Sequence, residues 1–128
     1  MKKQYGYKLT LKGILSETEA EKVLDEVKNI IVEFDNGFSV FVDVTKIEII
    51  PNDTKEQIAQ LQKFCNLNGL KRTAVVVKDQ LTVMQLSLLA KKTGISHTER
   101  YFDGSQLNFE SKVLEWLESA KEPSSQSM

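Results

Sequence analysis

The amino-acid sequence predicts a single α/β domain with a mainly parallel β-sheet. Four extended apolar runs alternate along the chain with four runs in which apolar residues recur at helical spacing. The segments between consecutive extended runs are long enough for a crossover helix, which parallel strands require. A chain of 128 residues fits one domain, and no linker interrupts the alternation. We therefore expect a four-stranded sheet and the element order βαβαβαβα.

The first unit is a half-buried strand followed by a helix. In residues 5–12 apolar side chains alternate with Gly, Lys and Thr, which is the period of a strand with one face in water. Ser16 and Glu19 have the spacing of a capping box and predict the start of a helix. Its apolar residues lie three and four positions apart, so that one stripe faces a core: Ala20, Val23, Leu24, Val27, Ile30 and Ile31.

The second unit begins with a central strand. Residues 38–44 carry apolar side chains on both faces, as in the interior of a parallel sheet. After Pro51, the Asp53–Glu56 spacing again resembles a capping box, so Asn52 or Asp53 is expected to cap a second helix. That helix ends at Gly69, and its apolar side, which includes Cys65, is expected to face the core.

Residues 73–77 form a second apolar, β-branched run and predict another central strand. The helix predicted for residues 80–93, ended by Gly94, carries two apolar stripes, one more than a single packing surface needs. The first stripe is Leu81, Met84 and Leu88, and the second is Val83, Leu86 and Ala90.

The last unit is an edge strand and a final helix. Residues 97–102 include Glu99 and Arg100, charges that suit a strand at the edge of a sheet. Ser105 is expected to cap the helix, whose apolar positions are Phe109, Val113, Trp116, Leu117 and Ala120. The domain is therefore expected to span residues 1–121, and residues 122–128 to form a disordered polar tail.

Composition limits the classes of function. Hydrophobic residues make up 41% of the chain, and 17 basic against 18 acidic residues leave a net charge of -1. Nucleic-acid binding needs a concentrated basic field, so nucleic acid is not an expected partner. The single cysteine cannot form an internal disulfide, and residues 1–5 lack the apolar core of a secretory signal. Together with apolar runs too short for a membrane span, these features predict a soluble cytoplasmic protein.

Several stretches carry a family pattern. A strand ends in Gly13 before the first helix, the strand of residues 38–44 contains Asp43 near its end, and Arg100–Asp103 precedes a helix that closes on Trp116-Leu117. This pattern resembles the STAS family of anti-sigma-factor antagonists, in particular an uncharacterised bacterial branch that has itself been likened to the lipid-binding CRAL-TRIO fold. The resemblance implies a superhelix of β-α units with sequential strand order and most helices on one sheet face.

The resemblance also implies which face of the sheet is left open. Polar side chains of the first two strands are expected to face solvent there, with Phe41 as the apolar exception: Lys8, Thr10, Lys12, Ser39 and Asp43.

The resemblance implies an interaction site at the start of the second helix. Regulatory STAS proteins carry Asp-Ser-Ser-Gly there, and a partner kinase phosphorylates a serine. This chain has Pro51, Asn52, Asp53 and Thr54 instead, so the acceptor serine is missing and Asp53 already supplies negative charge. Thr54 is the only hydroxyl of the bend. We expect a non-enzymatic module that binds an unidentified regulatory protein through these four residues.

A second candidate surface is apolar. Phe41, Val83, Leu86 and Ala90 are expected to form an interface or a ligand-binding surface, unless neighbouring helices simply bury them. The alternative function is a carrier or sensor of a small apolar ligand, such as a fatty acyl chain, held between the sheet and the third helix. A homodimer through Phe41 and the third helix is a further prediction.

No residue pattern indicates catalysis. His97 lacks a predicted partner, Cys65 has no neighbouring thiol or histidine, and the segment 69–72 has one glycine and leads into a strand, unlike a phosphate loop. Trp116 either anchors a partner or closes the core. We therefore expect no enzymatic activity, no cofactor and no metal site.

Overall fold

The computed structural model describes residues 1–123 and contains one five-stranded sheet with the strand order β1-β2-β3-β4-β5. Strand β1 runs antiparallel to β2, and every other neighbouring pair is parallel. In chain order the elements are β1 (Lys2–Lys3), β2 (Gly6–Ile14), α1 (Glu17–Ile31), β3 (Phe38–Ile49), α2 (Asn52–Leu67), β4 (Leu70–Val77), α3 (Gln80–Thr93), the 3₁₀ turn η1 (Ser96–Thr98), β5 (Glu99–Asp103) and α4 (Phe109–Ser119).

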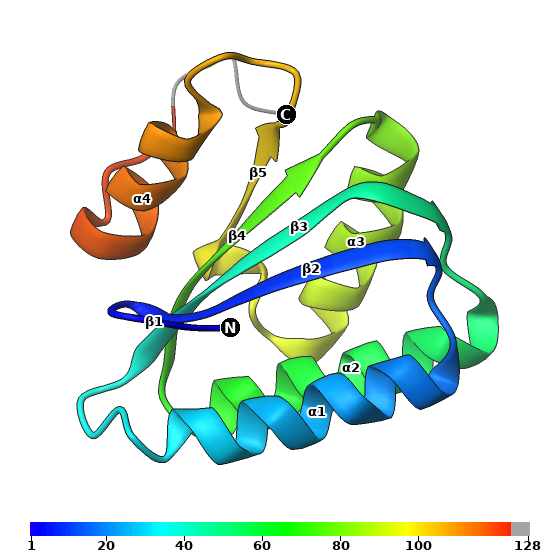
Figure 1. The fold of residues 1–128 in the computed structure, drawn as a ribbon, viewed down its shortest axis with the longest axis horizontal. Helices are drawn as coiled ribbons and strands as arrows, with labels where there is room; N and C mark the ends of the chain where they lie inside the picture. The colour runs from blue at the N-terminus through cyan, green and yellow to red at the C-terminus, as the bar shows by residue number, and fades with distance from the viewer. Residues whose placement is uncertain (124–128) are drawn as a thin grey trace.

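The helices form two unequal layers around the sheet. Helices α1, α2 and α3 cover one face, and α4 alone covers the other (Figure 1). The α/β class, the mainly parallel sheet and the sequential strand order agree with expectation. The predicted number of four strands is wrong, because the structure has a fifth strand, β1, at the edge of the sheet. This strand pairs with β2 through only two residues, Lys2 and Lys3. A strand of that length is too short to show an alternating pattern.

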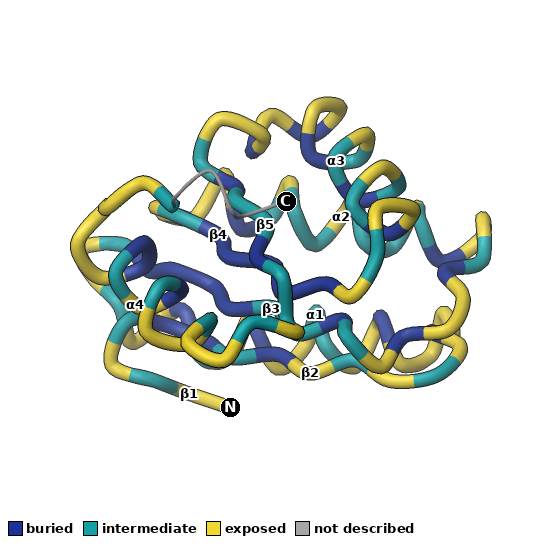
Figure 2. Tube along the Cα trace, turned by 90° about the horizontal axis from the view of Figure 1, so that it is seen from above, coloured by how far each residue is buried: buried dark blue, intermediate teal, exposed yellow. Residues whose placement is uncertain are grey.

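The core lies on both faces of the central strands. The second half of β4 is buried throughout, as Figure 2 shows along the tube. On the face covered by α4, residues of three strands pack against the helix in one cluster: Phe41, Ala74, Val76, Phe102, Val113, Trp116 and Leu117. The opposite face packs against α1, α2 and α3 through two further clusters that include Tyr7, Val27, Val44 and Val75. Prediction of β3 and β4 as central strands is therefore confirmed.

The sheet face that was expected to be open is partly covered by helix α4. Ser39 was expected to face solvent, but it is buried under α4, and its hydroxyl donates to the Leu117 carbonyl at 3.3 Å.

The α4 helix itself begins at Phe109 and not at Ser105. The Ser105 amide and hydroxyl instead donate to Asp103 Oδ1, at 2.9 and 2.7 Å, and so close a turn after β5.

The predicted tail is only partly described. Glu122 accepts from Arg100 Nε at 2.8 Å and from Arg100 Nη2 at 3.0 Å, so the chain remains against β5 beyond residue 121. The remainder of the predicted tail, residues 124–128, lies outside the described residues.

One glycine is required by close backbone packing. Gly6 opens β2 with φ +150°, and a Cβ atom built on it would lie 2.1 Å from the carbonyl oxygen of Ser39. No real Cβ makes such a contact, and the neighbouring atom is backbone that cannot rotate away. Gly13, near the other end of β2, also has positive φ (+62°), but its Cβ would meet nothing within 4 Å.

We expect Gly6→Ala to lower the free energy of unfolding by about 2–4 kcal/mol, because β2 must move away from β3. Gly13→Ala is the control, and its cost should be about 1 kcal/mol because only the left-handed backbone opposes it. Urea denaturation of both variants measures the difference. Equal costs would show that the approach of Gly6 to Ser39 does not constrain the sheet.

Candidate functional site

The carboxyl ends of β2 and β3 meet the first turns of α1 and α2 at one edge of the sheet. The Leu15 amide donates to the Ile49 carbonyl at 3.3 Å, and the Thr54 hydroxyl donates to the Leu15 carbonyl at 2.7 Å. These bonds join the β2–α1 connection to the β3–α2 connection. In parallel α/β sheets, this edge is where binding sites usually lie.

The four residues predicted as a partner-binding loop differ in accessibility. Asn52 and Asp53 are exposed and Pro51 is half-buried, but Thr54 is only 1% exposed. Because the Thr54 hydroxyl is buried and bonded to Leu15, it is not accessible for modification in the folded chain. The expected cap is wrong as well. The helix starts at Asn52, so Pro51 occupies the cap position and no side chain caps the first turn.

An exposed apolar pair flanks this loop. Ile14 and Ile49 lie opposite each other in the β2–β3 register, and each is 56% exposed. Sequence reasoning missed both residues because β3 was expected to end before Ile49 and β2 before Ile14. With Pro51, Asn52 and Asp53 they form what we call the rim surface.

The other predicted surface is buried. Phe41, Leu86 and Ala90 are at most 7% exposed, and Val83 is partly buried against the cluster that contains Leu86. Phe41 lies under α4, whereas Val83 and Leu86 pack on the opposite face of the sheet, so the structure does not bring the predicted surface together. The exposed stripe of α3 is the opposite one, Leu81, Met84 and Leu88, at 60–65% exposure. Both stripes have helical spacing, so only the docking of α3 against the sheet decided which one is buried.

Strand β5 is an edge strand, as predicted, but Glu99 does not face solvent. It is 6% exposed and accepts a hydrogen bond from the Tyr101 hydroxyl, on the sheet face covered by α3. Burial raises the pKa of Glu99 to about 7, although the Tyr101 hydrogen bond acts in the opposite direction. Sequence reasoning missed this group because a charged residue on an edge strand usually faces water.

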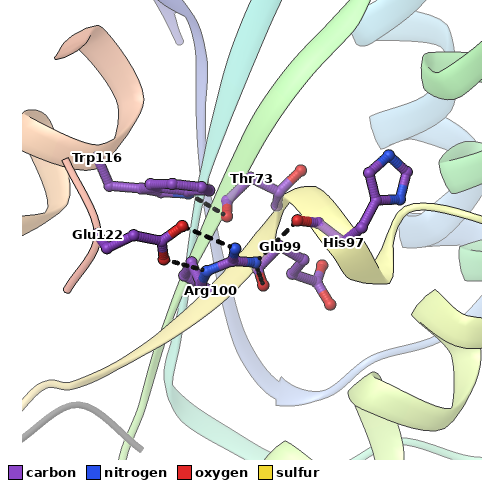
Figure 3. A network of polar contacts seen from close by, with 6 residues as sticks. All are labelled: Thr73, His97, Glu99, Arg100, Trp116 and Glu122. Carbon is purple, nitrogen blue, oxygen red and sulfur yellow. Dashed lines mark hydrogen bonds and ion pairs between the residues drawn. The ribbon is translucent and has the colours of Figure 1, made fainter. Parts of the chain in front are cut away.

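The next residue, Arg100, lies on the opposite face of β5. Figure 3 shows its guanidinium beside the Glu122 carboxylate and the Trp116 ring, with Glu99 directed away from them. The guanidinium carbon lies 4.5 Å from the Trp116 ring centroid, a cation–π contact, and Trp116 Nε1 donates to the Thr73 carbonyl at 3.1 Å. Trp116 is 4% exposed, so it closes the core.

The remaining candidate residues have structural surroundings. His97 is exposed in η1, and its carbonyl accepts from Arg100 Nη1 at 3.0 Å. Cys65 is in the core, as predicted, and burial raises its pKa to about 12, which leaves the thiol unreactive. Lys71 is exposed, whereas Arg72 donates to the Leu117 carbonyl at 3.3 and 3.1 Å and so stabilises the end of α4.

Within residues 1–123, no group of three or more His, Cys, Asp or Glu side chains is arranged to hold a metal ion. No helix in the same range is both long and apolar enough to cross a bilayer. Comparison of the chain with protein-family models, with curated proteins and with solved structures found no match.

The burial of Glu99 predicts a pH-dependent stability. Because its folded pKa lies above the usual 4.5, the unfolded chain releases this proton first as the pH rises. The free energy of unfolding should therefore fall between pH 4.5 and 7, by an amount on the order of 3 kcal/mol, and Glu99→Gln should remove this decline. Urea denaturation across that interval measures it. Glu21→Gln, on the exposed side of α1, is the matched control and should keep the wild-type slope.

Proposed function

We propose that the chain is a non-enzymatic, STAS-like protein-interaction module that binds a regulatory protein through the rim surface. The observation that carries the proposal is the exposed pair Ile14 and Ile49 beside the exposed start of α2. Apolar side chains at the centre of a patch exclude water from an interface, while polar residues around them set its orientation. The sequential strand order and the placement of three helices on one sheet face support the proposal, because the family resemblance implies both.

The charges around the rim surface indicate the chemistry of the partner. Asp53 lies in the first turn of α2, and Glu17 and Glu19 lie in the first turn of α1. Acidic side chains are favourable at helix N-termini, so the negative charge is a stable part of this edge. The partner should therefore present an apolar side chain flanked by basic residues.

The module acts without a phosphorylation switch at this edge. In the related regulatory proteins a phosphate changes the charge at the start of the second helix. Here the Thr54 hydroxyl donates to the Leu15 carbonyl, 39 residues away along the chain. This bond holds the β2–α1 connection against the β3–α2 connection. Asp53 supplies negative charge at this position without modification, so binding should not depend on a kinase.

We expect Asp53→Lys to weaken partner binding at least tenfold, because it reverses the charge next to the apolar pair. A protein recovered with the wild-type chain from its native host would be purified and titrated calorimetrically against the variants. Asp35→Lys is the matched control: Asp35 is also exposed but lies in the turn before β3, at the opposite end of the sheet.

Ile49→Ser tests the apolar part of the rim surface, and Leu67→Ser, at an 83% exposed position that ends α2, is its control. Binding should fall with Ile49→Ser and persist with Leu67→Ser. Equal effects of the two serine variants, or full binding by Asp53→Lys, would contradict the proposal.

A further inference from the structure

A cavity of about 90 Å³ lies inside the described part of the chain, between the sheet and the three helices that cover it. Its wall is mainly aliphatic and comes from both layers: Leu9, Val42 and Val75 from the strands, and Val27, Leu61 and Leu86 from the helices. Leu86 was expected in an apolar ligand surface, and this cavity is where it contributes to one.

The volume limits what the cavity can hold. A single water needs roughly 10–15 Å³ of such space, and an apolar cavity of roughly 150 Å³ accommodates benzene. A volume of about 90 Å³ therefore suits a molecule smaller than benzene, of roughly four or five non-hydrogen atoms. A long fatty acyl chain, the example of a ligand for the alternative carrier function, is larger than this volume.

Four polar residues interrupt the aliphatic wall: Gln57, Gln62, Thr73 and Glu99. Gln57 Oε1 is buried and accepts no hydrogen bond from any described residue. Glu99 also lines the cavity and already accepts from Tyr101. Gln62, another lining residue, is engaged because its Oε1 accepts from the Thr93 hydroxyl at 2.8 Å. An unpaired buried acceptor is costly, so the Gln57 oxygen is the position where a ligand donor gains most.

The charge of the wall decides the class of ligand. No Lys, Arg or His is among the described residues that line the cavity, so a carboxylate would be buried without a cationic partner. A buried ammonium would need an ionised Glu99, and burial keeps that carboxyl largely protonated below pH 7. An uncharged donor has neither cost.

We propose that the cavity binds a small branched aliphatic alcohol, whose alkyl group fills the space between Val42, Val75 and Leu86 and whose hydroxyl donates to Gln57 Oε1. This site is separate from the rim surface, and its occupation does not require the proposed protein partner. The chain would thereby respond to a small neutral metabolite through the interior of the sheet–helix layer.

Titration with four probes at pH 6 tests the proposal by ¹H–¹⁵N NMR: isobutanol, its isomer isopropyl methyl ether, isobutylamine and isobutyrate. Isobutanol should shift the amides of Val42, Val75 and Leu86 and bind roughly tenfold more tightly than the ether, which cannot donate. The amine and the carboxylate should bind more weakly than the alcohol. A cavity that admits none of the probes, or a preference for the ether, amine or carboxylate, would overturn the proposal.

The variant Gln57→Leu provides the second part of the test, because it replaces the acceptor by an apolar side chain of similar size. The alcohol and the ether should then bind equally, within about twofold, and the variant should be at least as stable as wild type in urea. Gln60→Leu, at an exposed position of the same helix, is the matched control and should keep the preference for the alcohol. If the preference survives Gln57→Leu, the hydroxyl is not bound by Gln57.

Discussion

Burial of β3 and β4 on both faces is the constraint on which the rest of the structure depends. In β4, four consecutive residues from Ala74 to Val77 are at most 2% exposed, so neither face of the sheet can be left in water. Three helices cover one face, and the other is closed by α4, which the chain reaches only after β5. Each fully buried large apolar side chain on the α4 side, such as Phe102, contributes roughly 2–3 kcal/mol relative to exposure.

Polar contacts then fix how α4 lies on the sheet. The Trp116 indole bonds the backbone of β4, while Ser39 and Arg72 both donate to the Leu117 carbonyl near the end of the helix. Arg100 packs on Trp116 and pairs with Glu122, which follows α4. These contacts come from three strands and from segments as much as 78 residues apart. Helix α4 is therefore held against β3, β4 and β5 by polar as well as apolar contacts.

The two candidate sites, the rim surface and the internal cavity, both result from the packing of helices on the sheet. At the carboxyl edge, the last residues of β2 and β3, Ile14 and Ile49, pair with each other and are each 56% exposed. Inside the layer, three helices pack on a twisted sheet without filling it, which leaves a cavity reached by Gln57 and Glu99. The edge offers apolar and acidic groups to a macromolecule, whereas the interior offers acceptors to a small donor.

The sequence by itself determined the α/β class, the parallel central strands and the capped start of α1, because these follow from local periodicity and from Ser16 next to its own helix. Only the tertiary structure decided which stripe of α3 is buried, that Thr54 is bonded to Leu15, and that Glu99 points inward from an edge strand. Each of these depends on how one element docks on another. Side-chain spacing records the period of a helix or strand, but it does not record the rotation of that element about its axis or the depth at which it packs.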